Sequence, residues 1–299
     1  MIAFASSITR PEVYERHALR GFRLAAEADS ELLSQPANGS IFRSYNEIIE
    51  RAAERDDLEA LVIVHQDAEI VDPQFCPKLR AELRDPQVAI VGCVGAVGVR
   101  SIAWWEGSTT WGSFVHRYPE YGGGEFPAFS WKEHEAPPYA RTGETDTVDG
   151  FVLCLAPWTV RNLRFDESLG LVLHGYDFDL CLQARAAGRT VRTADFKLVH
   201  HHSLELVGDP ESYIEAHVRL AEKWDGRMPE VGRAGGDWRS RARRAEAEAA
   251  AARAQTLYAR LEIDAREREH ARQLEEALDS ISWRITAPLR RLAAERRRA

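Results

Sequence analysis

The fold of this chain is decided by Leu58-Glu59-Ala60-Leu61-Val62-Ile63-Val64, continued by His65-Gln66-Asp67-Ala68-Glu69. The first seven residues are mostly Leu, Val and Ile without polar alternation, which is typical of a strand that is buried on both faces. Amphipathic helices are expected before and after it, over 41–53 and 73–83. This arrangement predicts an α/β fold with a mostly parallel sheet flanked by helices.

The same alternation of strands and helices extends over most of the chain. Further strands are expected over 2–8, 88–94, 148–155 and 190–199, with a short run near 32–33, and further helices over 13–26, 176–187 and 211–224. Residues 95–147 instead show no sustained period. An irregular insert of this length inside a compact domain is usually functional, as a lid or a binding wall.

Composition divides the chain near residue 236. Residues 232–236 are typical of a linker, so we predict one domain over 1–236 and a helical tail over 237–299. The tail is rich in Ala, Arg, Glu and Leu. Its leucines at 257, 261, 274 and 278 have spacings close to those of a coiled coil, but Ala and charged residues fill the intervening heptads. A coiled coil and a solvated helix both remain open.

The charge distribution argues against nucleic acid as a partner. The whole chain carries a net charge of −8, and the residues before Arg239 carry 24 basic against 37 acidic side chains. Phosphate binding requires clustered Lys and Arg, which this region lacks. A small phosphorylated ligand remains compatible with it if a bound cation supplies the positive charge.

Four cysteines, Cys76, Cys93, Cys154 and Cys181, form no CxxC pair and are expected to be buried thiols in a reducing cytosol. The first residues lack a basic region followed by a long apolar run, and nowhere do 18 apolar residues follow one another. We therefore expect a cytoplasmic protein that does not cross a membrane.

Asp67 is the first candidate for metal chemistry. It follows the apolar strand directly, where open parallel sheets place their ligand sites. Carboxylate oxygens are preferred ligands of Mg²⁺ and Mn²⁺, and His65 or Glu69 lies close enough in sequence to contribute. The alternative is that Asp67 caps the following turn.

Asp177 and Asp179 are two residues apart at the start of a predicted helix, so their side chains point in different directions. We expect one of them to serve as a general base and choose Asp177, with Asp179 in a supporting role. The competing interpretation is that both carboxylates interact with the helix dipole.

Three consecutive histidines, His200, His201 and His202, follow the strand predicted over 190–199. Imidazole is a common metal ligand, and consecutive residues at a strand end place at least one ring on each side. Zinc motifs such as HExxH are not present. A solvated loop is the alternative.

Taken in order, these motifs resemble those of the GT-A glycosyltransferases of family 2. The similarity covers roughly residues 2–230 and is strongest over 148–203, including Val148-Asp149-Gly150 and Gly175-Tyr176-Asp177-Phe178-Asp179. The resemblance implies a GT-A, Rossmann-like fold, a nucleotide-diphosphate sugar donor, and Mn²⁺ or Mg²⁺ as cofactor.

The resemblance also implies roles for individual residues. Asp67 matches the second acidic position of the family's DxD motif, Asp177 the aspartate of its ED motif, and His200 its late histidine ligand. Two positions depart from the family pattern: His65 replaces the first Asp of DxD, and Tyr176 replaces the Glu before Asp177.

The donor would be bound by residues at the ends of the strands. The resemblance places Ser6 and Ser7 near the nucleotide base and Asp149 near the donor sugar or acceptor, and His65 and Gln66 are expected to complete this binding set.

The acceptor is expected in the insert 95–147. Trp104, Trp105, Trp111 and Trp131 lie there, and flat apolar rings suit sugar faces. We assign acceptor binding to Trp104 and Trp105, assisted by Asp179, although for each tryptophan taken singly a place in the core is the better interpretation. A glycan, a lipid-linked molecule or a small molecule would serve as the acceptor.

The C-terminal segment Ser282-Trp283-Arg284-Ile285-Thr286-Ala287-Pro288-Leu289-Arg290-Arg291 resembles a short ending found after helical tails on bacterial polysaccharide-assembly enzymes. Apolar residues beside arginines suit an anionic bilayer surface at the inner membrane face. Binding to a partner, oligomerisation or a solvated terminus is left open.

Three functions follow from these observations. The first is a metal-dependent inverting glycosyltransferase of bacterial surface glycan or glycoconjugate synthesis. The second is a catalytically silent GT-A scaffold or glycan-binding subunit. The third is a metal hydrolase built on the histidines, which would bind zinc tightly and need no acceptor. The sugar, the nucleotide base, the linkage and the oligomeric state are not determined by the sequence.

Overall fold

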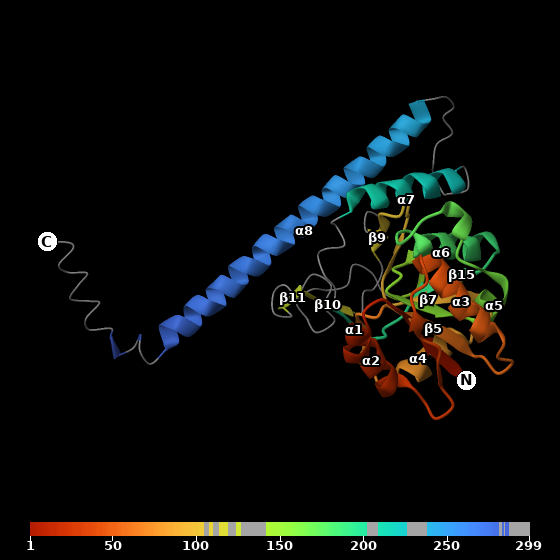
Figure 1. Cartoon of the computed structure of the whole chain (residues 1–299), viewed down its shortest axis with the longest axis horizontal. Coiled ribbons are helices and arrows are strands. Elements are labelled where there is room, and N and C mark those ends of the chain that lie inside the picture. The colour runs from red at the N-terminus through yellow and green to blue at the C-terminus, as the bar shows by residue number, and fades with distance from the viewer. Residues whose placement is uncertain are drawn as a thin grey trace. The chain divides into compact units, whose positions relative to one another are not determined.

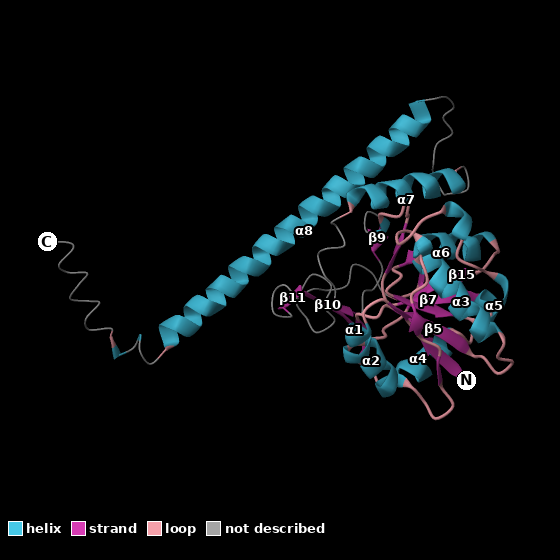
Figure 2. Cartoon of the chain, in the orientation of Figure 1, coloured by secondary structure: helices cyan, strands magenta, loops and turns pink. Residues whose placement is uncertain are grey.

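A computed structural model describes most of the chain. The described residues are 1–104, 108–109, 114–118, 124–126, 142–201, 209–225, 238–280, 283 and 285–286. They divide into two compact units, Met1–Ala254 and Gln255–Ala299. Figure 2 shows the α/β character of the first unit, with strands surrounded by helices.

A seven-stranded mixed sheet forms the centre of the first unit. Its strand order is β12 (Glu144–Thr145), β15 (Thr190–Thr193), β7 (Val88–Gly92), β14 (Val152–Leu155), β5 (Ala60–Val64), β1 (Ile2–Ala5) and β3 (Glu31–Leu32). The β15–β7, β5–β1 and β1–β3 pairs are parallel, whereas β14 runs antiparallel to both neighbours and β12 is antiparallel to β15. The predicted mixed, mostly parallel sheet is confirmed.

Helices cover both faces of this sheet, as Figure 1 shows. The helices of the first unit up to residue 223 are α1 (Pro11–Arg16), α2 (Ala18–Ala25), α3 (Ile41–Ala53), α4 (Phe75–Glu82), α5 (Pro157–Asn162), α6 (Tyr176–Ala186) and α7 (Pro210–Lys223), with a 3-10 turn at Glu167–Leu169. In β5, Ala60, Val62 and Val64 pack with residues of α2 and α4, while Leu61 and Ile63 pack with residues of α3 and α6. Burial on both faces explains why the strand sequences do not alternate.

A second sheet lies beside the first and carries part of the site described below. Its strand order is β11 (Gly124–Phe126), β10 (Phe114–Tyr118), β16 (Leu198–His201) and β6 (Ala68–Ile70). Smaller sheets are formed by β13 (Thr147–Val148), β8 (Gly95–Val97) and β9 (Ser108–Thr109), and by β2 (Ser7–Ile8) and β4 (Gln35–Pro36). The insert 95–147, predicted to lack regular structure, therefore contains several short strands in its described part.

Three predicted elements are interrupted in the structure. The strand expected over 148–155 divides into β13 and β14, and the one expected over 190–199 divides into β15 and β16, with Lys197 at a positive φ of 52° before β16. The helix expected over 13–26 is divided at His17, a turn residue between α1 and α2 whose φ and ψ are −117° and −77°. Each break redirects the chain to a different packing partner.

The long helix α8 (Trp238–Asp279) begins in the first compact unit. Its residues Ala247 and Ala251 are buried and pack with Ile214 of α7. The predicted boundary at 236 falls outside the described residues. In the second unit, the residues of α8 with large apolar side chains exposed to solvent are Leu257 (47%), Ile263 (56%), Leu274 (60%) and Leu278 (43%).

None of the helices in the described part of the chain combines the length and the apolar character that a bilayer crossing requires. All four cysteines are free and buried, as their apolar surroundings in the sequence suggest.

Gly21 allows α2 to approach β6 closely. A Cβ atom built on Gly21 would lie 2.4 Å from the backbone nitrogen of Ile70. Because backbone atoms cannot move aside as a flexible side chain can, any larger residue at this position pushes α2 away from the strand.

Gly21→Ala is therefore expected to destabilise the protein, although alanine favours helix by about 0.5–1 kcal/mol over glycine. Overpacking against a fixed neighbour costs about 1–3 kcal/mol, which exceeds that gain. Chemical denaturation of the wild type and the variant measures the difference. Leu24→Ala, at an exposed position of the same helix, is the control. Equal or higher stability of Gly21→Ala would contradict the close approach.

Candidate active site

The antiparallel direction of β14 brings two distant parts of the chain together. Val152 of β14 lies opposite Val64 of β5. Because paired strands of opposite direction place the start of one beside the end of the other, residues 149–151 lie next to residues 65–67. A backbone hydrogen bond of 2.9 Å from the His65 nitrogen to the Phe151 carbonyl oxygen fixes this register.

Three potential metal ligands converge beside this junction. His65, Asp67 and His200 offer donor atoms that all lie within 4.8 Å of one another. Asp67 Oδ1 lies 3.6 Å from His200 Nε2. The pairing of β16 with β6 accounts for this contact, since His200 lies opposite Ala68. One carboxylate and two imidazoles form a donor set suited to a divalent ion such as Mn²⁺, so the residues fit the expected metal.

The His200 ring has a fixed position. Its side chain is buried and stacks on the ring of Phe151, with centroids 4.7 Å apart and planes inclined by 12°. The His65 ring lies edge-on to it at a centroid distance of 5.7 Å. Packing of this kind limits rotation of the imidazole and keeps its nitrogen atoms close to Asp67.

His65 connects this group of potential metal ligands to helix α6. Its Nε2 lies 2.6 Å from the hydroxyl oxygen of Tyr176. Burial lowers the pKa of His65 to about 4, despite the nearby carboxylates of Asp67 and Asp149, so the ring is neutral at pH 7. When Nε2–H donates to Tyr176, the lone pair on Nδ1 is available to a metal ion.

Gly150 makes room for Tyr176. A Cβ atom on Gly150 would lie 2.2 Å from the tyrosine hydroxyl oxygen. The Gly150 nitrogen also donates a hydrogen bond of 2.8 Å to Asp177 Oδ2. One glycine thus positions both the partner of His65 and the next carboxylate.

Asp177 lies in the first turn of α6. Its carboxylate accepts backbone hydrogen bonds from Gly150 and Phe178, both of 2.8 Å. Burial raises the pKa of Asp177 to about 7, and the nearby Asp149 carboxylate adds to the rise, while the two backbone amides oppose it. A carboxyl group whose pKa lies near neutrality is suited to accept a proton.

The predicted donor-binding residues differ in their accessibility. Ser6 is fully buried, and its hydroxyl donates to the Val64 carbonyl oxygen at 2.7 Å, so its side chain stabilises the sheet. Ser7 is half-buried in β2. The Gln66 side chain accepts from the backbone nitrogens of Thr9 and Arg10 at 2.9 and 2.8 Å, and so holds the segment after β2 against the turn that carries Asp67.

Glu69 does not join Asp67, contrary to the predicted metal set. Its carboxylate instead lies 3.2 Å from His201 Nε2 and near His17. The reason is the strand geometry: consecutive residues of β16 face opposite sides, so His200 and His201 point to different neighbours. The expectation that the histidines face both sides agrees with this placement; His202 lies outside the described residues.

Asp179 does not face an acceptor. Its buried carboxylate accepts hydrogen bonds from Gln183, Lys223 and Trp224, at 2.8, 2.9 and 2.8 Å, and thereby ties α6 to the end of α7. This corrects the predicted acceptor contact, because no part of the carboxylate is accessible.

Among the tryptophans of the insert, the structure describes Trp104 alone. Trp104 is partly buried and packs against the hydrophobic residues on both sides of the central sheet. Its placement agrees with a core role. Trp105, Trp111 and Trp131 lie outside the described residues.

Tyr176 and Gly150 were not predicted as site residues. The sequence interpretation treated Tyr176 only as a departure from a family pattern. The small residue directly after Asp149 and the aromatic residue directly before Asp177 were the available signals, but their contact depends on the pairing of β14 with β5, which the sequence does not reveal.

Carboxylates and imidazoles thus gather at the end of β5 and the start of β14, within a mixed α/β sheet. The chain belongs to the glycosyltransferase-like family, which matches residues 3–206. The family resemblance and the fold class predicted from the sequence are both confirmed.

Two curated proteins are similar in sequence. The streptomycin biosynthesis protein StrF of Streptomyces griseus is 27% identical over 206 residues, which cover 68% of this chain and 67% of that protein. The O-antigen biosynthesis protein RfbC of Myxococcus xanthus is 27% identical over 166 residues, covering 54% of this chain but only 12% of RfbC.

Two solved structures show a more distant similarity. The mannosyltransferase PcManGT from Pyrobaculum calidifontis, in complex with GDP-Man and Mn²⁺, has a TM-score of 0.48 and 13% identity, covering 95% of this chain and 81% of that one. GalNAc-T7 with UDP, GalNAc and Mn²⁺ has a TM-score of 0.48 and 9% identity, covering 76% and 48% respectively.

The raised pKa of Asp177 predicts a pH dependence of stability. Between the ordinary aspartate pKa of 3.8 and about 7, the folded protein retains a proton on Asp177 that the unfolded chain has released. The stabilisation is therefore complete below the unfolded value and is lost as the pH rises through about 7. Each unit of pKa difference corresponds to about 1.4 kcal/mol.

Asp177→Asn removes this titration. The stability of the wild type relative to this variant should therefore fall as the pH rises from 4 to 8, measured by urea denaturation in EDTA to exclude metal binding. A difference that is constant over this range would show that the Asp177 pKa is not raised.

Proposed function

We propose that this protein transfers a sugar from a nucleotide-diphosphate donor to a hydroxyl group of an acceptor, with inversion at the anomeric carbon. A glycan, a lipid-linked molecule or a small molecule would serve as acceptor. The names of StrF and RfbC support a biosynthetic role, in the assembly of a bacterial surface glycan or a related glycoconjugate.

One observation carries the proposal. A carboxyl group with a pKa of about 7, Asp177, lies in the same site as His65, Asp67 and His200, which form a donor set for a divalent ion. A glycosyl transfer from a nucleotide diphosphate needs both a base for the acceptor and positive charge for the leaving group.

The proposed reaction is a single displacement. The acceptor oxygen forms a bond with the anomeric carbon as the bond from that carbon to the diphosphate oxygen breaks. Asp177 accepts the acceptor hydroxyl proton and later releases it to solvent. Attack from the side opposite the leaving group inverts the anomeric configuration. Asp149 lies close enough to raise the pKa of Asp177 and is proposed to orient the donor sugar or the acceptor.

Asp67, His200 and His65 would hold the metal ion, Mn²⁺ or Mg²⁺. Such an ion would offset the negative charge that develops on the departing diphosphate. Ser7, in β2, and Gln66, in the turn after β5, are proposed to contact the nucleotide, with the buried Ser6 holding the ends of β1 and β5 in place.

Replacing Asp177, the proposed general base, tests catalysis separately from donor binding. Asp177→Asn should lower the transfer rate by about 10²–10⁴-fold, because general base catalysis contributes on that order. Binding of the nucleotide sugar with Mn²⁺, measured by calorimetry after a thermal-shift screen of donors, should be retained. Asp67→Asn should instead weaken Mn²⁺-dependent donor binding.

Asp56→Asn, at an exposed position away from the site, is the matched control and should leave both measurements unchanged. Full transfer activity of Asp177→Asn would overturn the assignment of the base. A wild-type protein that binds no nucleotide sugar in the presence of Mn²⁺ would instead favour the catalytically silent scaffold. Cleavage of esters or phosphates with zinc and without any acceptor would favour the metal hydrolase.

The tail is proposed to act as a peripheral contact with the inner face of the membrane or with a second copy, for a protein that works in the cytoplasm. Exposed apolar side chains support this, at Leu274, Leu278, Trp283 and Ile285. Arginines 290 and 291 follow them in the sequence, outside the described residues.

Cosedimentation with anionic liposomes should therefore decrease when the chain is truncated at residue 236, and should weaken with added salt. The molar mass in light scattering of the same two proteins reports oligomerisation. If truncation changes neither the binding to liposomes nor the molar mass, the tail does not have the proposed role.

A further inference from the structure

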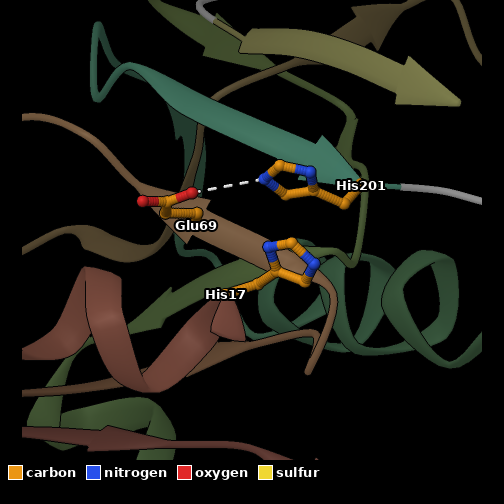
Figure 3. Close-up of side chains that lie close together, drawn as sticks. All are labelled: His17, Glu69 and His201. Carbon is orange, nitrogen blue, oxygen red and sulfur yellow. Dashed lines mark hydrogen bonds and ion pairs between the residues drawn. The ribbon is translucent and has the colours of Figure 1, made fainter. Parts of the chain in front are cut away.

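A second group of potential metal ligands lies on the other side of β16. His17, Glu69 and His201 offer donor atoms within 4.8 Å of one another. Figure 3 shows these side chains converging from the α1–α2 junction, from β6 and from β16. His201 follows His200 directly, and consecutive strand residues face opposite sides, so this group is separate from the proposed catalytic metal site.

The distances approach those of a coordination site. Glu69 Oε2 lies 3.2 Å from His201 Nε2. Donor atoms bound to one ion at about 2.0–2.2 Å in tetrahedral geometry lie about 3.3 Å apart. The carboxylate and one imidazole therefore already have the spacing of ligands that share an ion.

His17 supplies the third donor from a backbone that is held on both sides. Its nitrogen donates to the Val13 carbonyl oxygen of α1, and its carbonyl oxygen accepts from the Gly21 nitrogen of α2, both at 3.0 Å. Its ring stacks on that of His201 with centroids 3.7 Å apart. The close approach of Gly21 to Ile70 fixes the distance between this junction and β6.

The three elements are thus preorganised. Strands β6 and β16 are held by their pairing, in which Glu69 lies opposite Val199, and α2 is held against β6. Coordination by both rings requires that the stack of His17 on His201 opens by rotation of the His17 side chain.

The charge balance also permits a cation. Glu69 is the sole carboxylate among the three ligands, and its described cationic partner is Arg20, with 3.3 Å between Arg20 Nε and Glu69 Oε1. The Arg20 side chain is 76% exposed. It can therefore turn into solvent when an ion takes its place beside the carboxylate.

We propose that His17, Glu69 and His201 form a second binding site, for a divalent transition-metal ion such as Zn²⁺. Two imidazoles and one carboxylate form an open site with room for water or another ligand. An ion there would link the α1–α2 junction to the strand pair that carries Asp67 and His200. The site is distinct from the proposed transfer chemistry and does not depend on it.

Metal stoichiometry tests the proposal directly. The full chain is dialysed against Zn²⁺, and the bound metal is counted by elemental analysis. His17→Gln and Glu69→Gln should each lose about one equivalent relative to the wild type. Asp67→Asn should retain that equivalent, since it alters only the first group of ligands.

His270→Gln, on the exposed part of α8, controls for histidine removal and should bind as much Zn²⁺ as the wild type. Thermal unfolding of each metal-free variant shows whether it folds. Zn²⁺ should also raise the unfolding temperature of Asp67→Asn but should raise that of the double variant His17→Gln/Asp67→Asn much less, because an ion bound only to the native state stabilises it.

Folded His17→Gln and Glu69→Gln proteins that bind as much Zn²⁺ as the wild type would overturn the site, leaving the three side chains as a hydrogen-bonded and stacked contact between helix and sheet. Because counting the bound Zn²⁺ ions requires no sugar donor, this result does not depend on whether the protein catalyses glycosyl transfer.

Discussion

The proposed chemistry depends on the antiparallel pairing of β14 with β5. A parallel strand at this place would put its first residues at the far edge of the sheet, about 15 Å from the end of β5 for strands of this length. The observed direction places Asp149 and Gly150 beside His65. Through Gly150, the same pairing sets the position of Tyr176 and of Asp177 at the start of α6. A single choice of strand direction therefore assembles groups from three separate parts of the sequence.

Burial then gives these groups their chemical properties. It raises the pKa of Asp177 and lowers that of His65, so that both lie away from the values of the free side chains. The folded protein loses some stability at neutral pH in keeping Asp177 in this environment. Asp179, only two residues away, shows the opposite outcome: fully enclosed by donors from Gln183, Lys223 and Trp224, it stabilises the packing of two helices.

The local pattern predicted α3 at its observed bounds, Ile41–Ala53, and the apolar run of β5, because helical periodicity and strand burial are recorded in neighbouring residues. The position after β5 also selected Asp67, and the family resemblance selected His200; the structure brings the two side chains together. The partner of Glu69 and the direction of β14 were not predictable, since they depend on which strands pair across the sheets. The break at His17 was missed for a similar reason: the sequence of α1 and α2 is continuous in helical character, and packing against β6 determines where the helix ends.

The contact between Gly150 and Tyr176 has a consequence for how this site can change. The tyrosine hydroxyl fills the space that a side chain at position 150 would need. A larger residue there can be accommodated only after residue 176 becomes smaller, and that change removes the hydrogen bond to His65. Substitutions at these two positions are therefore coupled, and their order matters. A larger residue at position 150 requires an earlier change at position 176, and the intermediate protein lacks the hydrogen bond that holds the His65 ring.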